Sequence, residues 1–190
     1  MSAASPRAKA AEAAGVDLRP LTESDFTDRY LAWFHDLDVI RFLDARDITR
    51  QDAIDHLRQG QGGLLWRIYA ICETSSRRHI GNLKIGPINR KHSVSDMVTI
   101  IGEREAWGKG YARAAIRLGI DIAFGELKLR KLSASIDSLN LGSLKAYQAA
   151  GFVVEAALKD QFVGPNGELS DKIYVGCFNP AVACGTGSAL

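Results

Sequence analysis

The residues best suited to chemistry lie in the stretch "WGKGYA", where Gly108, Lys109 and Gly110 separate a run of β-type residues from an amphipathic helix. The first backbone N–H groups of a helix are unpaired, and the helix dipole adds about half a positive charge there. Glycines let a phosphate approach these N–H groups because no Cβ intervenes. The stretch therefore predicts a pyrophosphate-binding loop, with an ordinary tight turn as the alternative.

Two common phosphate-binding motifs do not fit this stretch. A P-loop requires GxxxxGK[ST], but Gly102 lies one residue too far back and Gly110 stands where the hydroxyl residue belongs. A Rossmann site requires GxGxxG in the first crossover of a parallel sheet. Here the third glycine position is Arg113, and the preceding strands form a meander.

The elements that position this loop follow from the hydrophobic pattern. The loop comes after three consecutive strand-like runs and precedes a long helix, and "KLSASID" then alternates strictly between apolar and polar residues. These patterns predict one α/β (α+β) domain, with a mostly antiparallel mixed sheet of about seven strands and about four helices. The other expected elements are a strand at "VDLRP", a helix after Thr22 or Ser24, a helix from Thr49 to Gly60, a turn at "GPIN", a short helix from Asn140 to Gly151, and a hairpin from about Phe152 to Phe178.

Composition places the chain among ordinary globular proteins. Its 190 residues are 46% hydrophobic and 24% charged, with a formal net charge of +2. We expect no nucleic-acid partner and no membrane partner. The three cysteines lack metal-ligand spacing, so we expect reduced thiols in a cytoplasmic protein and no metal. We predict flexible tails at residues 1–15 and 180–190 around a domain at 16–179.

Two motifs resemble those of the GNAT superfamily of acetyl-CoA-dependent N-acetyltransferases. Its first motif is [Q/R]-x-x-G-x-[G/A], and Gly110 and Ala112 occupy its two small positions. Trp107 stands where Gln or Arg is usual. This departure affects one side-chain contact only, because such a loop binds mainly through its backbone. "NLGSLKAYQAAGF" is similar to the second signature, in which an Asn is followed seven residues later by Tyr and then by GF. The resemblance covers about residues 17–178 and implies a sheet splayed at strands 4 and 5.

The resemblance also assigns residues to acetyl-CoA. It implies that the pyrophosphate lies on the glycine loop and that the pantetheine arm runs along the end of the fourth strand. Asn140 would contact the arm, with helix capping as the alternative or additional role. The implied cofactor-binding residues are Thr99, Ile100, Ile101, Trp107, Gly108, Lys109, Gly110, Tyr111, Ala112 and Asn140.

Catalysis in such enzymes is direct attack of an amine on the thioester in a ternary complex. Tyr147 is the expected general acid for the leaving thiolate, and the alternative is an aromatic residue of the core. Asp96 is the expected base, and the alternative is a solvated strand carboxylate. Glu103 and His92 are weaker candidates. Orientation of the amine alone contributes roughly 7–11 kcal/mol, so a strong base is not required.

The acceptor is the least determined part of the prediction. The motifs resemble the branch of ribosomal-protein N-terminal acetyltransferases, which indicates a protein N-terminus. "HIGNLKIGPINRKH" is instead similar to a segment of enzymes that act on nucleotide-linked amino sugars, which indicates a small amine. A CoA-binding regulatory module is the alternative without catalysis, and the chain is expected to be a monomer or homodimer. Candidate acceptor residues are Phe34, His35, Arg90 and His92, although aromatic residues at helical spacing favour a core position for Trp33 and Phe34.

Overall fold

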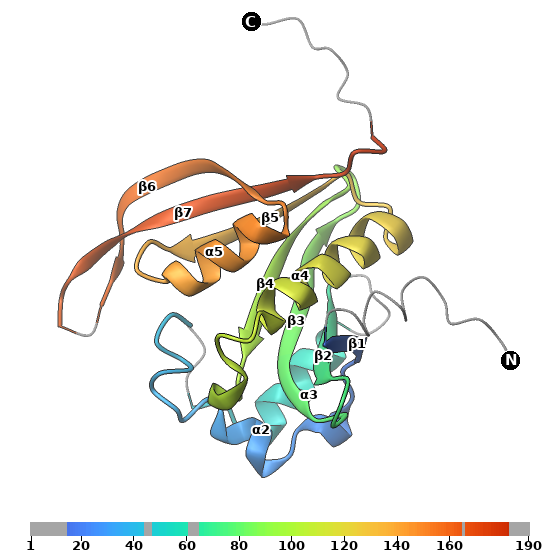
Figure 1. The fold of residues 1–190 in the computed structure, drawn as a ribbon, viewed down its shortest axis with the longest axis vertical. Coiled ribbons are helices and arrows are strands. Elements are labelled where there is room, and N and C mark those ends of the chain that lie inside the picture. The colour runs from blue at the N-terminus through green and yellow to red at the C-terminus, as the bar shows by residue number, and fades with distance from the viewer. Residues whose placement is uncertain (1–14, 44–46, 61–64, 165, 183–190) are drawn as a thin grey trace, which may run out of the picture.

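The computed structural model describes residues 15–43, 47–60, 65–164 and 166–182, and they form one seven-stranded sheet flanked by helices (Figure 1). The strand order is β1-β2-β3-β4-β5-β7-β6, and every neighbouring pair is antiparallel except β4 and β5. The strands are β1 Val16–Pro20, β2 Arg67–Glu73, β3 His79–Asn89, β4 Val94–Ile101, β5 Lys131–Asp137, β6 Val153–Val163 and β7 Leu169–Phe178.

Four α-helices accompany the sheet in the described part of the chain. They are α2 Asp28–Ala32, α3 Arg50–Gln59, α4 Tyr111–Asp121 and α5 Leu141–Ala150. Two 3-10 turns, η1 Glu23–Asp25 and η2 Arg104–Ala106, and a π-helical turn, η3 Ile122–Glu126, complete the structure. The mixed seven-stranded sheet and the four helices confirm the predicted fold class.

The two faces of the sheet carry separate cores because neighbouring residues of a strand point in opposite directions. On β2, Tyr69 and Ile71 join the core beneath α4 and α5, whereas Ala70 and Cys72 join the core beneath α2 and α3. Figure 1 shows α4 crossing one face of the central strands and α3 on the opposite face. The sheet therefore lies between two helical layers, and β4 contacts both.

β4 and β5 pair over only the first part of their length. The parallel register runs from Val94–Lys131 to Asp96–Ser133, and from residue 97 onward β4 pairs with β3 alone among the described strands. β5 continues instead along β7. This separation agrees with the predicted splay at strands 4 and 5, and it leaves one edge of β4 without a strand neighbour. We call residues 97–101 on this side the open edge of β4.

Two predicted features require correction. The first helix begins after Thr27, whose hydroxyl accepts a hydrogen bond from the Tyr30 N–H, while Thr22 precedes the 3-10 turn η1. "GPIN" is not a turn, because β3 continues through a cis Gly86–Pro87 peptide and an irregularity in its register with β4. The final hairpin and the helix capped by Thr49 agree with the sequence pattern.

The predicted tails fall mostly at residues 1–14 and 183–190, outside the described residues, so the domain limits stay a prediction. Among the described residues, no helix is long and apolar enough to cross a membrane. Within the same ranges, no group of three or more His, Cys, Asp or Glu side chains is arranged to hold a metal ion.

Candidate active site

The glycine loop, residues 107–111, leads directly into α4. Gly108 and Gly110 have φ angles of 73° and 81°, in the left-handed region that favours glycine. A side chain at Gly108 would point into open space, with no atom within 4 Å of its Cβ, and at Gly110 the nearest atom is the Arg113 guanidinium at 3.8 Å. The loop thus combines backbone conformations that need glycine with free space before an 11-residue helix. These are the features of an anion-binding helix terminus.

Side chains on both flanks hold the glycine loop in place. The Trp107 indole N–H donates to the Ile101 carbonyl at 2.8 Å, which ties the start of the loop to the end of β4. The Tyr111 hydroxyl donates to the Glu73 carboxylate at 2.9 Å, which ties the start of α4 to the end of β2. Trp107 nevertheless remains 43% exposed, so its ring also borders solvent beside the loop.

The open edge of β4 presents the backbone groups of alternate residues. The Gly102 N–H donates to the Ile80 carbonyl, so in an antiparallel ladder the backbone of Ile100 faces β3. The backbones of Met97, Thr99 and Ile101 then face away from β3, toward the side that β5 leaves. Ile100 therefore cannot pair with a ligand strand on this side, which narrows the predicted backbone contacts to Thr99 and Ile101.

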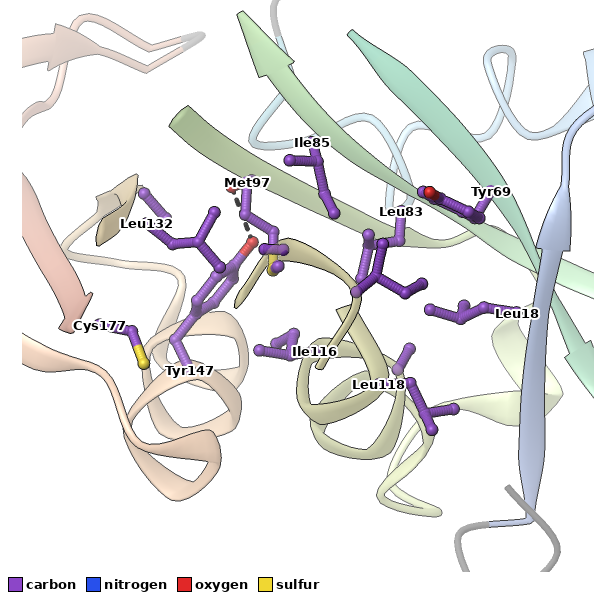
Figure 2. Close-up of a cluster of buried hydrophobic side chains, with 14 of the residues drawn as sticks. Leu18, Tyr69, Leu83, Ile85, Met97, Ile116, Leu118, Leu132, Tyr147 and Cys177 are labelled. Carbon is purple, nitrogen blue, oxygen red and sulfur yellow. Dashed lines mark hydrogen bonds between the residues drawn. The ribbon is translucent and has the colours of Figure 1, made fainter. Parts of the chain in front are cut away.

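Tyr147 lies beside this edge. Its hydroxyl donates to the Met97 carbonyl at 3.0 Å and lies 3.3 Å from the Thr99 hydroxyl. The ring is 3% exposed and packs edge-on against Phe152, with ring centroids 4.9 Å apart. Figure 2 shows the hydroxyl pointing from α5 to β4 between the side chains of Leu132 and Ile116. Burial raises the pKa of Tyr147, and the hydrogen bond with Thr99 opposes this shift only in part.

The two interpretations of Tyr147 are therefore compatible in geometry. The ring is part of the core, and the hydroxyl is the polar group that reaches the open edge of β4 from α5. A phenol is protonated at neutral pH, which is the state a proton donor requires, and burial makes this one a weaker acid than an exposed tyrosine because it raises the pKa.

Asp96 marks the point where β4 and β5 separate. It is the last residue of β4 in register with β5, opposite Ser133. Its side chain lies on the face opposite Met97, toward α2 and α3, and is only partly shielded from solvent. Partial burial of the carboxylate raises the pKa of Asp96, and the positive charge of Lys172 opposes that shift. Lys172 belongs to β7 and lies 76 residues away in sequence, so no local pattern could identify it.

Asn140 caps α5, as the sequence predicts. Its side-chain oxygen accepts a hydrogen bond from the Ser143 N–H at 3.1 Å. The capped helix carries Tyr147 two turns later, so Asn140 fixes the element that presents the phenol. A contact between Asn140 and the pantetheine arm stays a prediction.

The candidate acceptor residues do not come together. Phe34 is buried in the core of α2 and α3, and His35 is exposed with its Nδ1 3.5 Å from Asp47. Arg90 and His92 lie in the turn before β4, whereas α2 contacts the residues after β4. An eight-residue strand separates these positions by roughly 20–25 Å. The predicted set of four therefore does not form a single site.

Two further side chains have structural roles. Trp66 stacks on His56 with centroids 4.7 Å apart, and the Lys84 ammonium lies 4.4 Å above its ring, so this side chain joins α3 to β3. Glu103, a weaker candidate for the base, is 8% exposed and accepts a hydrogen bond from the Trp33 indole at 2.9 Å. Its carboxylate also faces Arg29 at 3.3 Å, so it is engaged in contacts within the protein.

Residues 16–153 match the acetyltransferase (GNAT) domain family, so the chain belongs to that family. It is 31% identical over 112 residues to a probable N-acetyltransferase, YjcK, of Bacillus subtilis (strain 168), covering 59% of this chain and 61% of that protein. It is also 31% identical over 107 residues to a spermidine N(1)-acetyltransferase of Vibrio cholerae, covering 55% of this chain and 61% of that enzyme.

The fold agrees with solved structures. A crystal structure of spermidine N-acetyltransferase from Vibrio cholerae in complex with CoA and spermine superposes with a TM-score of 0.77 at 21% identity, covering 86% of this chain and 95% of that one. The GNAT family and its fold, predicted from the two motifs, are thus confirmed, and acetyl-CoA is the acetyl donor of this family. The relatives named above act on spermidine or carry a general acetyltransferase name, so they do not support the ribosomal-protein branch specifically. The chain spans about 61% of the length of these curated relatives.

Proposed function

We propose that the protein is an N-acetyltransferase that moves an acetyl group from acetyl-CoA to a small, positively charged amine by direct attack in a ternary complex. The observation that carries this proposal is the open edge of β4. This edge has the Tyr147 hydroxyl on the Met97 carbonyl at its start and the glycine loop just beyond its end. A donor recognised by backbone groups would thus lie beside a phenol that can donate a proton.

The glycine loop fits the pyrophosphate of the donor. Its two left-handed glycines, the unpaired N–H groups at the start of α4 and the ammonium of Lys109 all favour an anion there. The backbone of Thr99 would pair with the extended pantetheine arm as a strand partner does. Acetyl-CoA itself supplies the activated thioester, and the roles of Trp107, Tyr111 and Ala112 are to shape and support the loop.

Two side chains would then move the protons of the reaction. The amine nitrogen forms a bond to the thioester carbon, the carbon–sulfur bond breaks, and Tyr147 gives its proton to the leaving sulfur. Asp96, on the opposite face of β4, takes the proton that the amine must lose, directly or through a water molecule. Partial burial raises the pKa of Asp96, which makes this carboxylate a better proton acceptor than an ordinary aspartate.

Charge favours a cationic acceptor over a nucleotide-linked sugar or a generic protein N-terminus. Residues 22–60, which supply α2 and α3, contain nine acidic residues and five arginines. An acidic layer attracts a polyamine and repels the phosphates of a nucleotide sugar. The names of the relatives that act on spermidine agree with this choice.

Calorimetric titration with acetyl-CoA, followed by thiol release with a panel of amines, tests the proposal. The panel contains spermidine, spermine, a neutral primary amine of similar length, peptides with free N-termini and a nucleotide-linked amino sugar. We expect acetyl-CoA binding and fastest thiol release with the polyamines, with a rate that falls as ionic strength rises. Turnover only with the peptides or the nucleotide sugar would overturn the acceptor, and binding without any turnover would favour a regulatory module.

A further inference from the structure

A buried carboxylate joins the α2 layer to the segment that leads into the glycine loop. Glu103 follows β4 by two residues, and its side chain is 9% exposed. One oxygen accepts the Trp33 indole N–H at 2.9 Å and lies 3.3 Å from the Arg29 guanidinium. The other lies 3.7 Å from the Arg78 guanidinium. We call this group of four side chains the Glu103 anchor.

The Trp33 ring lies directly against the backbone at the same point. A Cβ at Gly102 would be 2.0 Å from the Trp33 ring, so only glycine permits this approach. Trp33 in turn packs against Tyr30 and His79, with centroids 5.2 and 5.0 Å away. The end of β4 is thus pressed against the aromatic core of α2.

The two residues after Glu103 extend the same connection. Arg104 contacts Asp38 at 2.7 Å, in the segment after α2, and Glu105 accepts a hydrogen bond from Arg78 at 2.7 Å. Three consecutive side chains therefore fix η2 against the α2 layer and against the turn before β3. η2 leads into the glycine loop, so its position sets the position of the proposed pyrophosphate site.

We infer that Glu103 is a positioning residue that holds the glycine loop in register with the α2 layer, so that CoA binding and amine binding depend on each other through it. This inference rests on the proposed function. It assigns Glu103 no proton transfer, because its carboxylate is buried and engaged by Trp33, Arg29 and Arg78. A loop and an acceptor layer that share one buried anchor shift together when the anchor is lost.

Glu103→Gln tests this inference against Glu23→Gln as the matched control, because Glu23 pairs with Arg58 at the surface of the α2 side and takes no part in the Glu103 anchor. Both variants remove one negative charge that faces an arginine. Only Glu103→Gln removes the charge that Arg29 and Arg78 face in the buried anchor. We expect it to raise the calorimetric Kd of CoA by about 5-fold or more and to raise the KM for spermidine, with a smaller change in kcat. Glu23→Gln should bind CoA as tightly as the wild type.

The possible outcomes separate a failure of this inference from a failure of the proposed function. A wild type that binds no CoA would overturn the proposed function and the inference with it. A wild type that binds, with an unchanged CoA Kd in folded Glu103→Gln, would overturn the inference alone, as would an equal loss in Glu23→Gln. A lower melting temperature without a change in Kd or KM would show a merely structural role and would also overturn it. If Glu103→Gln does not fold, Trp33→Phe removes the indole N–H donor together with part of the ring, and it should also raise the CoA Kd and the spermidine KM. Normal constants in that variant would count against the inference.

Discussion

The two faces of the sheet are stabilised in different ways. Beneath α4 and α5 the contacts are apolar, and Tyr147 is the buried residue there whose hydroxyl reaches β4. On the opposite face, charged side chains connect α2 and α3 to the rest of the structure around an aromatic core. These pairs include Arg58–Glu23, Arg50–Asp28, Arg29–Glu103 and Arg104–Asp38.

The segments on the two faces of the sheet also differ in charge. Residues 104–131, which contain the glycine loop and α4, have seven Lys or Arg and three acidic residues, whereas residues 22–60 have nine acidic residues and five arginines. An anionic donor and a cationic acceptor would be attracted to opposite sides of β4. The split between β4 and β5 is where the two sides meet, so we expect the chemistry at residues 96–99.

Gly110→Asp should give the largest effect, on the basic side. The substitution puts an L residue at a φ of 81° and a carboxylate against the proposed pyrophosphate site, so we expect CoA binding to weaken by about 100-fold or more. Gly167→Asp is the matched control, since Gly167 has the same φ of 81° and equally open surroundings in the β6–β7 turn. Calorimetry with CoA measures both variants. Equal affinities would contradict the assignment of the glycine loop.

Tyr147→Phe should lower turnover and leave the binding of acetyl-CoA nearly unchanged. Loss of the proton donor should lower kcat by about 100-fold, with CoA affinity nearly unchanged because the ring and its packing remain. Tyr30→Phe is the control on the other face: Tyr30 is also buried, and its hydroxyl accepts a hydrogen bond from Asn82. Thiol release with a polyamine should be normal in that variant. If both variants turn over equally, the Tyr147 hydroxyl only stabilises β4.

The sequence predicted the α4 side more completely than the α2 side, for a physical reason. Apolar periodicity, the glycines at 108 and 110 and the capping residue Asn140 are local signals, and they located α4, α5 and the loop. The ion pairs of the other face join residues far apart in sequence, such as Arg29 and Glu103. A pattern along the chain cannot show which charges will meet, and for this reason the Glu103 anchor was missed.

The candidate acceptor residues stay a prediction, and their separation in the fold escaped the sequence for a related reason. Aromatic and basic types suggested Phe34 and His92, but types alone do not show the register of β4, which puts these two positions at opposite ends of the strand. Asp96 could be placed on a strand from the sequence, whereas the end of β4–β5 pairing at that residue and the approach of Lys172 required the structure.

A pH–rate profile tests whether Asp96 connects the two sides. If it takes the proton of the amine, kcat/KM falls as pH decreases through its raised pKa, and Asp96→Asn removes this acid limb while lowering the plateau about 10-fold. The positive charge of Lys172 opposes the rise in the pKa of Asp96. Lys172→Met should therefore raise this pKa further and move the acid limb of the profile to higher pH. Lys159→Met is the control, because Lys159 pairs with Asp171 on the same hairpin. An acid limb that persists in Asp96→Asn would exclude this carboxylate as the base.

The smallest predicted effect concerns stability on the α2 side. Burial alone would raise the pKa of Asp25, but hydrogen bonds from Arg19 and Thr22 outweigh it and lower the pKa to about 2. A carboxyl whose pKa is depressed on folding stabilises the protein above its unfolded pKa, and this stability is lost as pH falls from about 4 to about 2. Asp25→Asn should therefore lower the free energy of unfolding by about 1–2 kcal/mol at pH 7, measured by urea unfolding, and by very little at pH 2.

Asp28→Asn is the control, because it breaks an exposed pair with Arg50. It should lower the free energy of unfolding by less than about 1 kcal/mol at either pH. Equal losses in the two variants would mean that the charged contacts of this face contribute only as ordinary surface pairs.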